Sequence, residues 1–226
     1  MDSWSEPFVH AIQKVPEYRQ SGKIVEIIGL VIESNGPSAA IGELCQIVEG
    51  ERVYCRAEVV GFKENRTLLM PLGQMQGIRP GMIVQTTGQT LAIDLARSML
   101  GRVLDGLGSP MDDKGPIETE ERRSIYAVPP NALHRTRITT PMHTGLKAID
   151  GFLTVGCGQR MGIFAGSGVG KSVTMGMIAR NCLAQVNVIA LIGERGREVL
   201  EFIEKDLGPE GLAKSVVIVA TSDQPA

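Results

Sequence analysis

The chain has 226 residues and a formal net charge of −2 at pH 7, with 43% hydrophobic and 21% charged side chains. This length and composition suit one large or two smaller globular domains and argue against disorder. The near-neutral charge gives no global reason to expect nucleic acid or an anionic membrane as partner. The N-terminus lacks a basic and apolar leader, and the longest apolar runs fall short of the ~20 residues of a spanning helix. We therefore expect a cytoplasmic protein.

The four cysteines, Cys45, Cys55, Cys157 and Cys182, are scattered along the chain. They form no C-x-x-C pair, and no His cluster at metal-binding spacing accompanies them. This pattern is typical of free thiols in a reducing compartment.

The N-terminal part of the chain is predicted to hold a short segment and a barrel. Residues 1–21 form the segment, with a short helix before Pro16. Residues 22–90 show short β-rich runs separated by Gly, Pro and Asn, and they lack helical periodicity. Such a pattern predicts a small antiparallel β-barrel. The expected strands are KIVEIIGLVIE (23–33), GELCQIV (42–48), RVYCRAEVVGF (52–62), TLLMPLG (67–73) and GMIVQTTG (81–88).

Residues 91–226 are predicted to form an α/β domain. Residues 91–150 are rich in Gly and Pro and are interpreted as a connecting region. From Gly156 the pattern alternates between strand and helix, which predicts a parallel sheet with right-handed crossovers. The expected elements are strand 159–165, helix 171–185 with Met175, Ile178, Ala179 and Cys182 on its buried face, strand 186–193 buried on both faces, helix 198–208 ending near Gly208 and Pro209, and strand 215–222.

The stretch AGSGVGKS (165–172) fits the phosphate-loop pattern G-x-x-x-x-G-K-[ST], except that Ala165 replaces the first Gly. Glycines let the backbone curl so that its N–H groups cradle phosphate oxygens, and the following helix offers the positive end of its dipole. Lys171 would reach the β- and γ-phosphates, and the Ser172 hydroxyl would ligate Mg²⁺. We therefore expect ATP and Mg²⁺ as ligands. The expected nucleotide-binding residues are Gly166, Ser167, Gly168, Val169, Gly170, Lys171, Ser172 and Val173.

Charged side chains follow the next expected strand, in the stretch GERGRE (193–198). If the sheet is parallel, this strand ends at the edge where ligands bind. Glu194 is then placed for the attacking water, Arg195 for charge on the γ-phosphate, and Glu198 for the outer shell of the metal. Lys171, Glu194 and Arg195 are the predicted catalytic residues. The alternative interpretation is a charged helix N-terminus, in which the dipole favours glutamate.

Taken together, GLKAIDGFLTVGCGQRMGIFAGSGVGKS and LIGERGREVLEFIE resemble the flagellum-specific and type III secretion ATPases, which are relatives of the catalytic subunit of the rotary ATP synthase. The resemblance extends back through LGRVLDGLGSPMD and AEVVGF, and it covers residues 22 to 226. It implies a RecA-like P-loop domain after the barrel, with Lys171, Ser172 and Glu194 at the family's functional positions. Ala is as common as Gly at the first loop position of this family.

The resemblance also implies what the protein does and where. The family hydrolyses ATP at the export gate, as a homohexamer held together in part by its barrels, and it releases and unfolds export substrates from their chaperones. The implied partners are those substrates and chaperones and the stalk and regulator proteins of the export apparatus, with no nucleic acid. Peripheral association with the inner face of the cytoplasmic membrane follows. The spellings AEVVGF and DGLGSPMDDKG favour flagellar over virulence secretion.

The family places a Walker B aspartate, an arginine finger and an aromatic wall for adenine after the third strand, beyond ATSDQPA (220–226). We therefore expect a fragment that is truncated before the Walker B strand, binds nucleotide at best and does not turn over. One alternative is a nucleotide-binding or oligomerisation module without turnover. A nucleic-acid translocase is disfavoured, because the barrel lacks interleaved basic and aromatic residues. A rotary ATP synthase subunit is disfavoured by the particular residues of the two motifs, AGSGVGKS and GERGRE.

Overall fold

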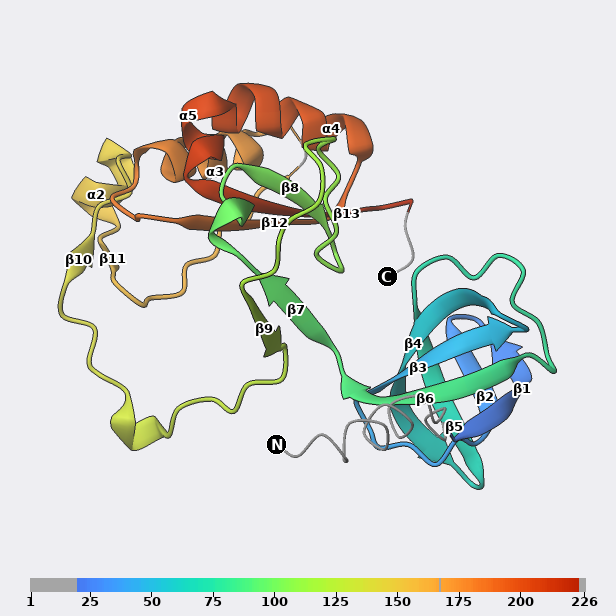
Figure 1. Cartoon of the computed structure of the whole chain (residues 1–226). Coiled ribbons are helices and arrows are strands. Elements are labelled where there is room, and N and C mark those ends of the chain that lie inside the picture. Colours follow the sequence, from blue (N-terminus) through green and yellow to red (C-terminus); the bar gives the residue numbers. More distant parts are fainter. Residues whose placement is uncertain (1–19, 167, 224–226) are drawn as a thin grey trace, which may run out of the picture. The chain divides into compact units, whose positions relative to one another are not determined.

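A computed structural model describes residues 20–166 and 168–223. The helix expected before Pro16 lies outside these residues. The described chain divides into two units, one up to Leu91 and one from Ala92 (Figure 1). No helix among the described residues is long and apolar enough to cross a membrane.

The first unit is a closed barrel of six antiparallel strands, which confirms the predicted architecture. The run 23–33, expected as one strand, forms two strands, because Gly29 at φ +60° makes a tight turn between them. The strands lie around the barrel in the order β1-β2-β5-β4-β3-β6. Their bounds are β1 Ser21–Ile28, β2 Val31–Asn35, β3 Glu43–Glu49, β4 Arg52–Lys63, β5 Arg66–Leu72 and β6 Ile83–Thr90.

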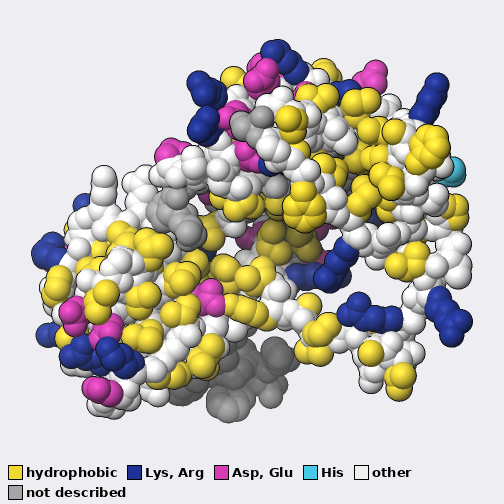
Figure 2. Space-filling view, turned by 180° about the vertical axis from the view of Figure 1, so that it is seen from behind, with side chains coloured by type: hydrophobic (Ala, Val, Ile, Leu, Met, Phe, Trp, Pro, Cys, Tyr) yellow, Lys and Arg dark blue, Asp and Glu magenta, His cyan; other side chains and the backbone are white. Residues whose placement is uncertain are grey.

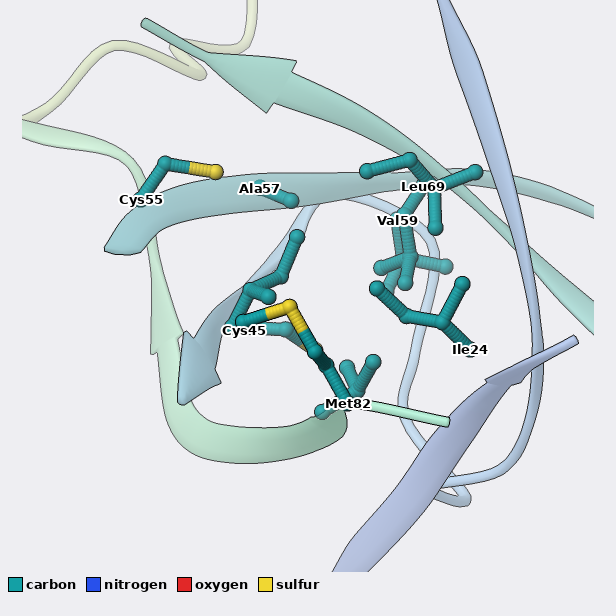
Figure 3. Close-up of a cluster of buried hydrophobic side chains, with 10 residues drawn as sticks. Ile24, Cys45, Cys55, Ala57, Val59, Leu69 and Met82 are labelled. Atoms are coloured by element: carbon teal, nitrogen blue, oxygen red, sulfur yellow. The ribbon is translucent and has the colours of Figure 1, made fainter. Parts of the chain in front are cut away.

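The barrel core is built by buried side chains from all six strands (Figure 3). In β4, Cys55, Ala57 and Val59 point inward at every second position, as the two-residue period of a strand requires. Burial raises the pKa of the Cys45 thiol to about 12 and that of Cys55 to about 11. These two cysteines are therefore packing residues of low reactivity.

The second unit contains a three-stranded parallel sheet in the order β12-β13-β8. Strands β12 (Asn187–Glu194) and β13 (Ser215–Thr221) were expected. Strand β8 (Arg102–Asp105) lies in the region that we interpreted as a connection, and that interpretation is wrong at this point. Four residues are too few to show a period, so only the pairing with β13 defines β8.

Helices pack on this sheet (Figure 1) and share a core with it. Helix α3 (Lys171–Asn181) is followed, after β12, by three helical segments in succession. The predicted end near Gly208 is confirmed, because Gly208 at φ +64° closes the second segment, and a separate short helix begins there with Pro209 in its first turn. The three segments are α4 Gly196–Glu201, the π-helix η3 Phe202–Leu207 and α5 Gly208–Ala213.

Two expectations for the sheet were wrong. Residues 159–165 form no strand, and Phe164 in this stretch is 96% exposed. Strand β12 is buried on one face only, because Ile189 and Leu191 pack in the core while Val188 and Ile192 are exposed. An apolar β-branched run shows that a segment suits a sheet, but a strand also needs a hydrogen-bonded neighbour.

Hydrophobic side chains are visible on the surface of both units (Figure 2).

A buried ion pair between Arg102 and Asp112 anchors the loop that follows β8. Arg102 donates from Nε and Nη2 to Asp112 at 2.7 and 2.8 Å. The Arg102 guanidinium and the backbone N–H of Val103 hold the pKa of Asp112 well below its usual range. The other elements are β7 Ala92–Leu95, η1 Arg97–Met99, β9 Glu121–Ser124, η2 Ala132–His134, β10 Pro141–Met142, α2 Lys147–Phe152 and β11 Val155–Gly156.

Candidate functional site

The phosphate loop turns directly into helix α3. Gly168 and Gly170 adopt φ values of +75° and +93°, which side chains rarely tolerate. Gly170 is the N-cap of α3 and offers no side-chain acceptor, and its carbonyl receives the N–H and the hydroxyl of Thr174, both at 2.9 Å. The helix therefore begins at Lys171 with the positive end of its dipole toward the loop.

Glu194 is the last residue of β12 and follows an irregularity in the ladder. Gly193 at φ +71° interrupts the regular pairing between Ile192 and Glu194. The carbonyl of Glu194 still accepts the N–H of Ser222, at 3.0 Å, which anchors the strand end to the segment after β13. A bulge of this kind re-aims the side chain that follows it. Glu194 is thereby placed at the carboxyl end of the parallel sheet.

Lys171 and Glu194, 23 residues apart in the chain, meet at this edge. Lys171 Nζ lies 3.4 Å from Glu194 Oε1, and the two side chains are 44% and 31% exposed. A second ion pair joins Arg195 Nη1 to Glu198 Oε1 at 3.4 Å, one turn along α4. Both pairs are solvent-accessible, so each contributes little to stability and a stronger ligand would displace it.

A cavity of about 240 Å³ lies between the N-terminus of α3, the end of β12 and helix α4. Four of the predicted residues line its polar part, namely Lys171, Ser172, Glu194 and Glu198. The remaining wall is formed by Met175, Ala190, Leu191, Ile192, Val199 and Phe202.

None of the six residues of the apolar wall was predicted as part of the site, and Met175 and Phe202 are the two most informative of them. Met175 was placed on the buried face of α3, but its side chain is 39% exposed and faces the cavity. Phe202 was not singled out, although it follows Glu198 by four residues and so lies on the same helical face. That spacing is the signal that would have found it.

The other predicted site residues that the structure describes are not among those that line the cavity. Arg195 is paired with Glu198, and Ser167 lies outside the described residues. The assigned roles of these residues stay predictions. Those in the loop and first helical turn are Gly166, Gly168, Val169, Gly170 and Val173.

The donor set fits a hard cation that keeps most of its water. The Ser172 hydroxyl and the Glu198 carboxylate both line the cavity, and oxygen ligands suit Mg²⁺. In the described part of the chain no three His, Cys, Asp or Glu side chains gather as a metal-binding group. Mg²⁺ usually takes one or two protein ligands and completes its shell with water and phosphate oxygens. The residues present therefore fit a nucleotide-bound magnesium ion.

Comparison with known proteins agrees with the fold and with the loop motif. The model for the ATP synthase alpha/beta family, beta-barrel domain, matches residues 24–88. The model for the ATP synthase alpha/beta family, nucleotide-binding domain, matches residues 145–226. The chain belongs to the ATP synthase alpha/beta family.

Within this family the similar proteins are those suggested by the motifs. A flagellum-specific ATP synthase of Bacillus subtilis (strain 168) is 49% identical over 230 residues, covering 98% of this chain and 51% of that protein. A type 3 secretion system ATPase of Xanthomonas euvesicatoria is 48% identical over 207 residues, covering 91% and 47%. The resemblance inferred from the sequence is confirmed.

The similar solved structures are also of a type III secretion system ATPase. The assembled ATPase EscN from the type III secretion system of enteropathogenic E. coli matches with a TM-score of 0.78 and 42% identity, over 90% of this chain and 49% of that one. EscN in complex with its central stalk EscO matches with the same TM-score and 43% identity, over 90% and 50%. The chain spans about half the length of the relatives it matches.

Proposed function

We propose that this chain is the barrel and nucleotide-binding part of an ATPase that energises protein export by a flagellar or type III secretion apparatus. The observation that carries the proposal is the meeting of Lys171 and Glu194 in one cavity at the N-terminus of α3. A phosphate-loop lysine beside a carboxylate at the end of the next strand suits phosphoryl transfer to water. The names of the relatives supply the export context.

The loop would bind the phosphate chain of ATP. Gly168 and Gly170 curl the backbone, α3 directs its dipole at the phosphates, and the Lys171 ammonium neutralises their charge. Ser172 and Glu198 would hold Mg²⁺, Ser172 directly and Glu198 through water. The metal, when bound, would neutralise charge that develops on the phosphate oxygens.

Glu194 would orient and deprotonate the attacking water. In the structure its carboxylate is paired with the Lys171 ammonium, at 3.4 Å. A bound polyphosphate offers Lys171 a more highly charged partner, and the exposed ion pair costs little to break. Nucleotide binding would thus release Glu194 toward the cavity. Arg195 would add positive charge near the γ-phosphate once it leaves Glu198.

Assembly and partners are part of the same proposal. We expect a homohexamer that acts on export substrates and their chaperones, together with stalk and regulator proteins, at the inner face of the cytoplasmic membrane. The assembled EscN structure and its complex with a stalk protein support this expectation for a similar chain.

The experiment is calorimetric titration of the chain with Mg-ADP and Mg-ATP. Replacing Lys171 with Ala should weaken binding about tenfold or more, because a charge-assisted contact to phosphate is lost. Lys205→Ala is the matched control, since Lys205 pairs with Glu201 at 2.8 Å on an exposed helical face. Equal affinity of the wild type and Lys171→Ala would contradict the loop assignment. Nucleotide binding by the chain, together with no phosphate release by a protein that spans the full length of the relatives, would identify a nucleotide-binding module.

A further inference from the structure

Helix α3 and the π-helix η3 touch backbone to backbone at Gly176. Gly176 is buried, and a Cβ atom at this position would overlap the backbone of Asp206. Only glycine allows two helices to approach so closely without displacement. Gly176 therefore sets the separation of the two helices.

Arg180 lies one turn further along the same face of α3 and ties it to η3. Its Nη1 donates to the backbone carbonyls of Lys205, at 3.4 Å, and of Asp206. Its aliphatic stem packs at Gly211, where an added Cβ would lie 3.0 Å from the Arg180 Cγ. Arg180 thus supplies a charged donor to carbonyls of the π-helical turn.

The π-helix is itself an uncommon feature at this place. Gly208 donates its N–H to Ile203, five residues back, so the turn is wider than an α-turn. π-helical turns are rare and occur frequently at functional sites. Here the wide turn places the Lys205 and Asp206 carbonyls within reach of Arg180.

We call the contact of Gly176 and Arg180 with Lys205 and Asp206 the seam. On each side of the seam, the helix also carries residues that line the nucleotide cavity. Gly176 lies five residues after Lys171, which is ~7.5 Å along the helix axis. On the other side, Asp206 follows the cavity residue Phe202 by four positions on the helical run that also carries Glu198. A shift at the seam would therefore change the position of Lys171 and Ser172 relative to the carboxylates.

We propose that Gly176 and Arg180 are positioning residues, which touch no nucleotide but hold the phosphate-binding helix in register with Glu194 and Glu198. This inference rests on the proposed function of the cavity. A purely structural role would instead lower the stability of the unit and leave the affinity of each folded molecule unchanged.

The test uses the 226-residue chain and three variants, Gly176→Ala, Arg180→Gln and Arg180→Lys. Mg-ADP affinity is measured at a temperature at which circular dichroism shows each variant folded. We expect about a tenfold loss for Gly176→Ala and Arg180→Gln, and a smaller loss for Arg180→Lys, which keeps a charged donor. Gly151→Ala is the control, because Gly151 lies in helix α2 with open space around an added Cβ.

Hydrogen exchange without nucleotide separates this inference from the proposed function. In Arg180→Gln, amides in residues 174–182 and 194–198 should exchange faster, while amides of β13 and the barrel strand β3 serve as internal references. Unchanged affinity per folded molecule, with exchange that rises evenly across the second unit, would overturn the positioning role. A wild type that binds no nucleotide would refute the proposed function, and the exchange pattern would still decide the seam.

Discussion

Replacing Glu194 with Gln should separate nucleotide binding from turnover. The glutamine amide keeps the size of the side chain but can no longer accept a proton from water. It also removes the partner of Lys171 in the free chain. We therefore expect binding to be retained or strengthened, and hydrolysis by a protein that spans the whole family length to fall by ~10² or more.

The size of the effect on binding follows from the geometry of the ion pair. Two unit charges at the observed 3.4 Å attract by ~1.2 kcal/mol in bulk water and by ~5 kcal/mol at an effective dielectric constant of ~20. Lys171 and Glu194 are 44% and 31% exposed, so the pair belongs with surface ion pairs of about 0–1 kcal/mol. Removing it should strengthen nucleotide binding by at most about fivefold.

The assay is titration of Mg-ADP into the wild type, Glu194→Gln and Glu201→Gln. Glu201 is the control, because it is an exposed carboxylate whose partner, Lys205, lies one turn along the helical run, at 2.8 Å. Phosphate release is followed in parallel in a protein of full family length. A loss of affinity greater than about fivefold in Glu194→Gln would refute the reasoning, since Glu194 would then itself hold the nucleotide or its metal.

Two further predictions concern the packing inside each of the two units. Asp112→Asn should lower the urea midpoint of the second unit at pH 7, because it removes the charged partner of Arg102. The pKa of Asp112 is lowered in the folded chain, so the difference in midpoint between wild type and variant should shrink as pH falls below about 4. A difference in midpoint that does not depend on pH would argue against the Arg102–Asp112 ion pair. Iodoacetamide at pH 8 should label the exposed Cys157 of the native chain and spare Cys45 and Cys55, whose thiol pKa values are about 12 and 11. Mass spectrometry of peptides measures the labelling of each cysteine, and faster labelling of Cys45 or Cys55 than of Cys157 would contradict the prediction.

Much of this protein follows from the sequence alone, because the signals involved are local. The barrel strands could be predicted because apolar residues recur at every second position between turn residues. The phosphate loop could be predicted because its requirements, glycines with positive φ and a lysine at the start of a helix, are contained in eight adjacent residues. Glu194 could be placed at the site edge because parallel strands end together.

Other features depended on neighbours that are distant in the chain. Strand β8 exists because β13 pairs with it, and residues 159–165 form no strand although their composition suits one. The 3.4 Å contact between Lys171 and Glu194 depends on how α3 packs beside β12. The π-helical turn at Asp206 shows no period of its own in the sequence. Backbone pairing and helix packing are long-range, so only the tertiary structure decided which segments meet at the cavity and what holds them there.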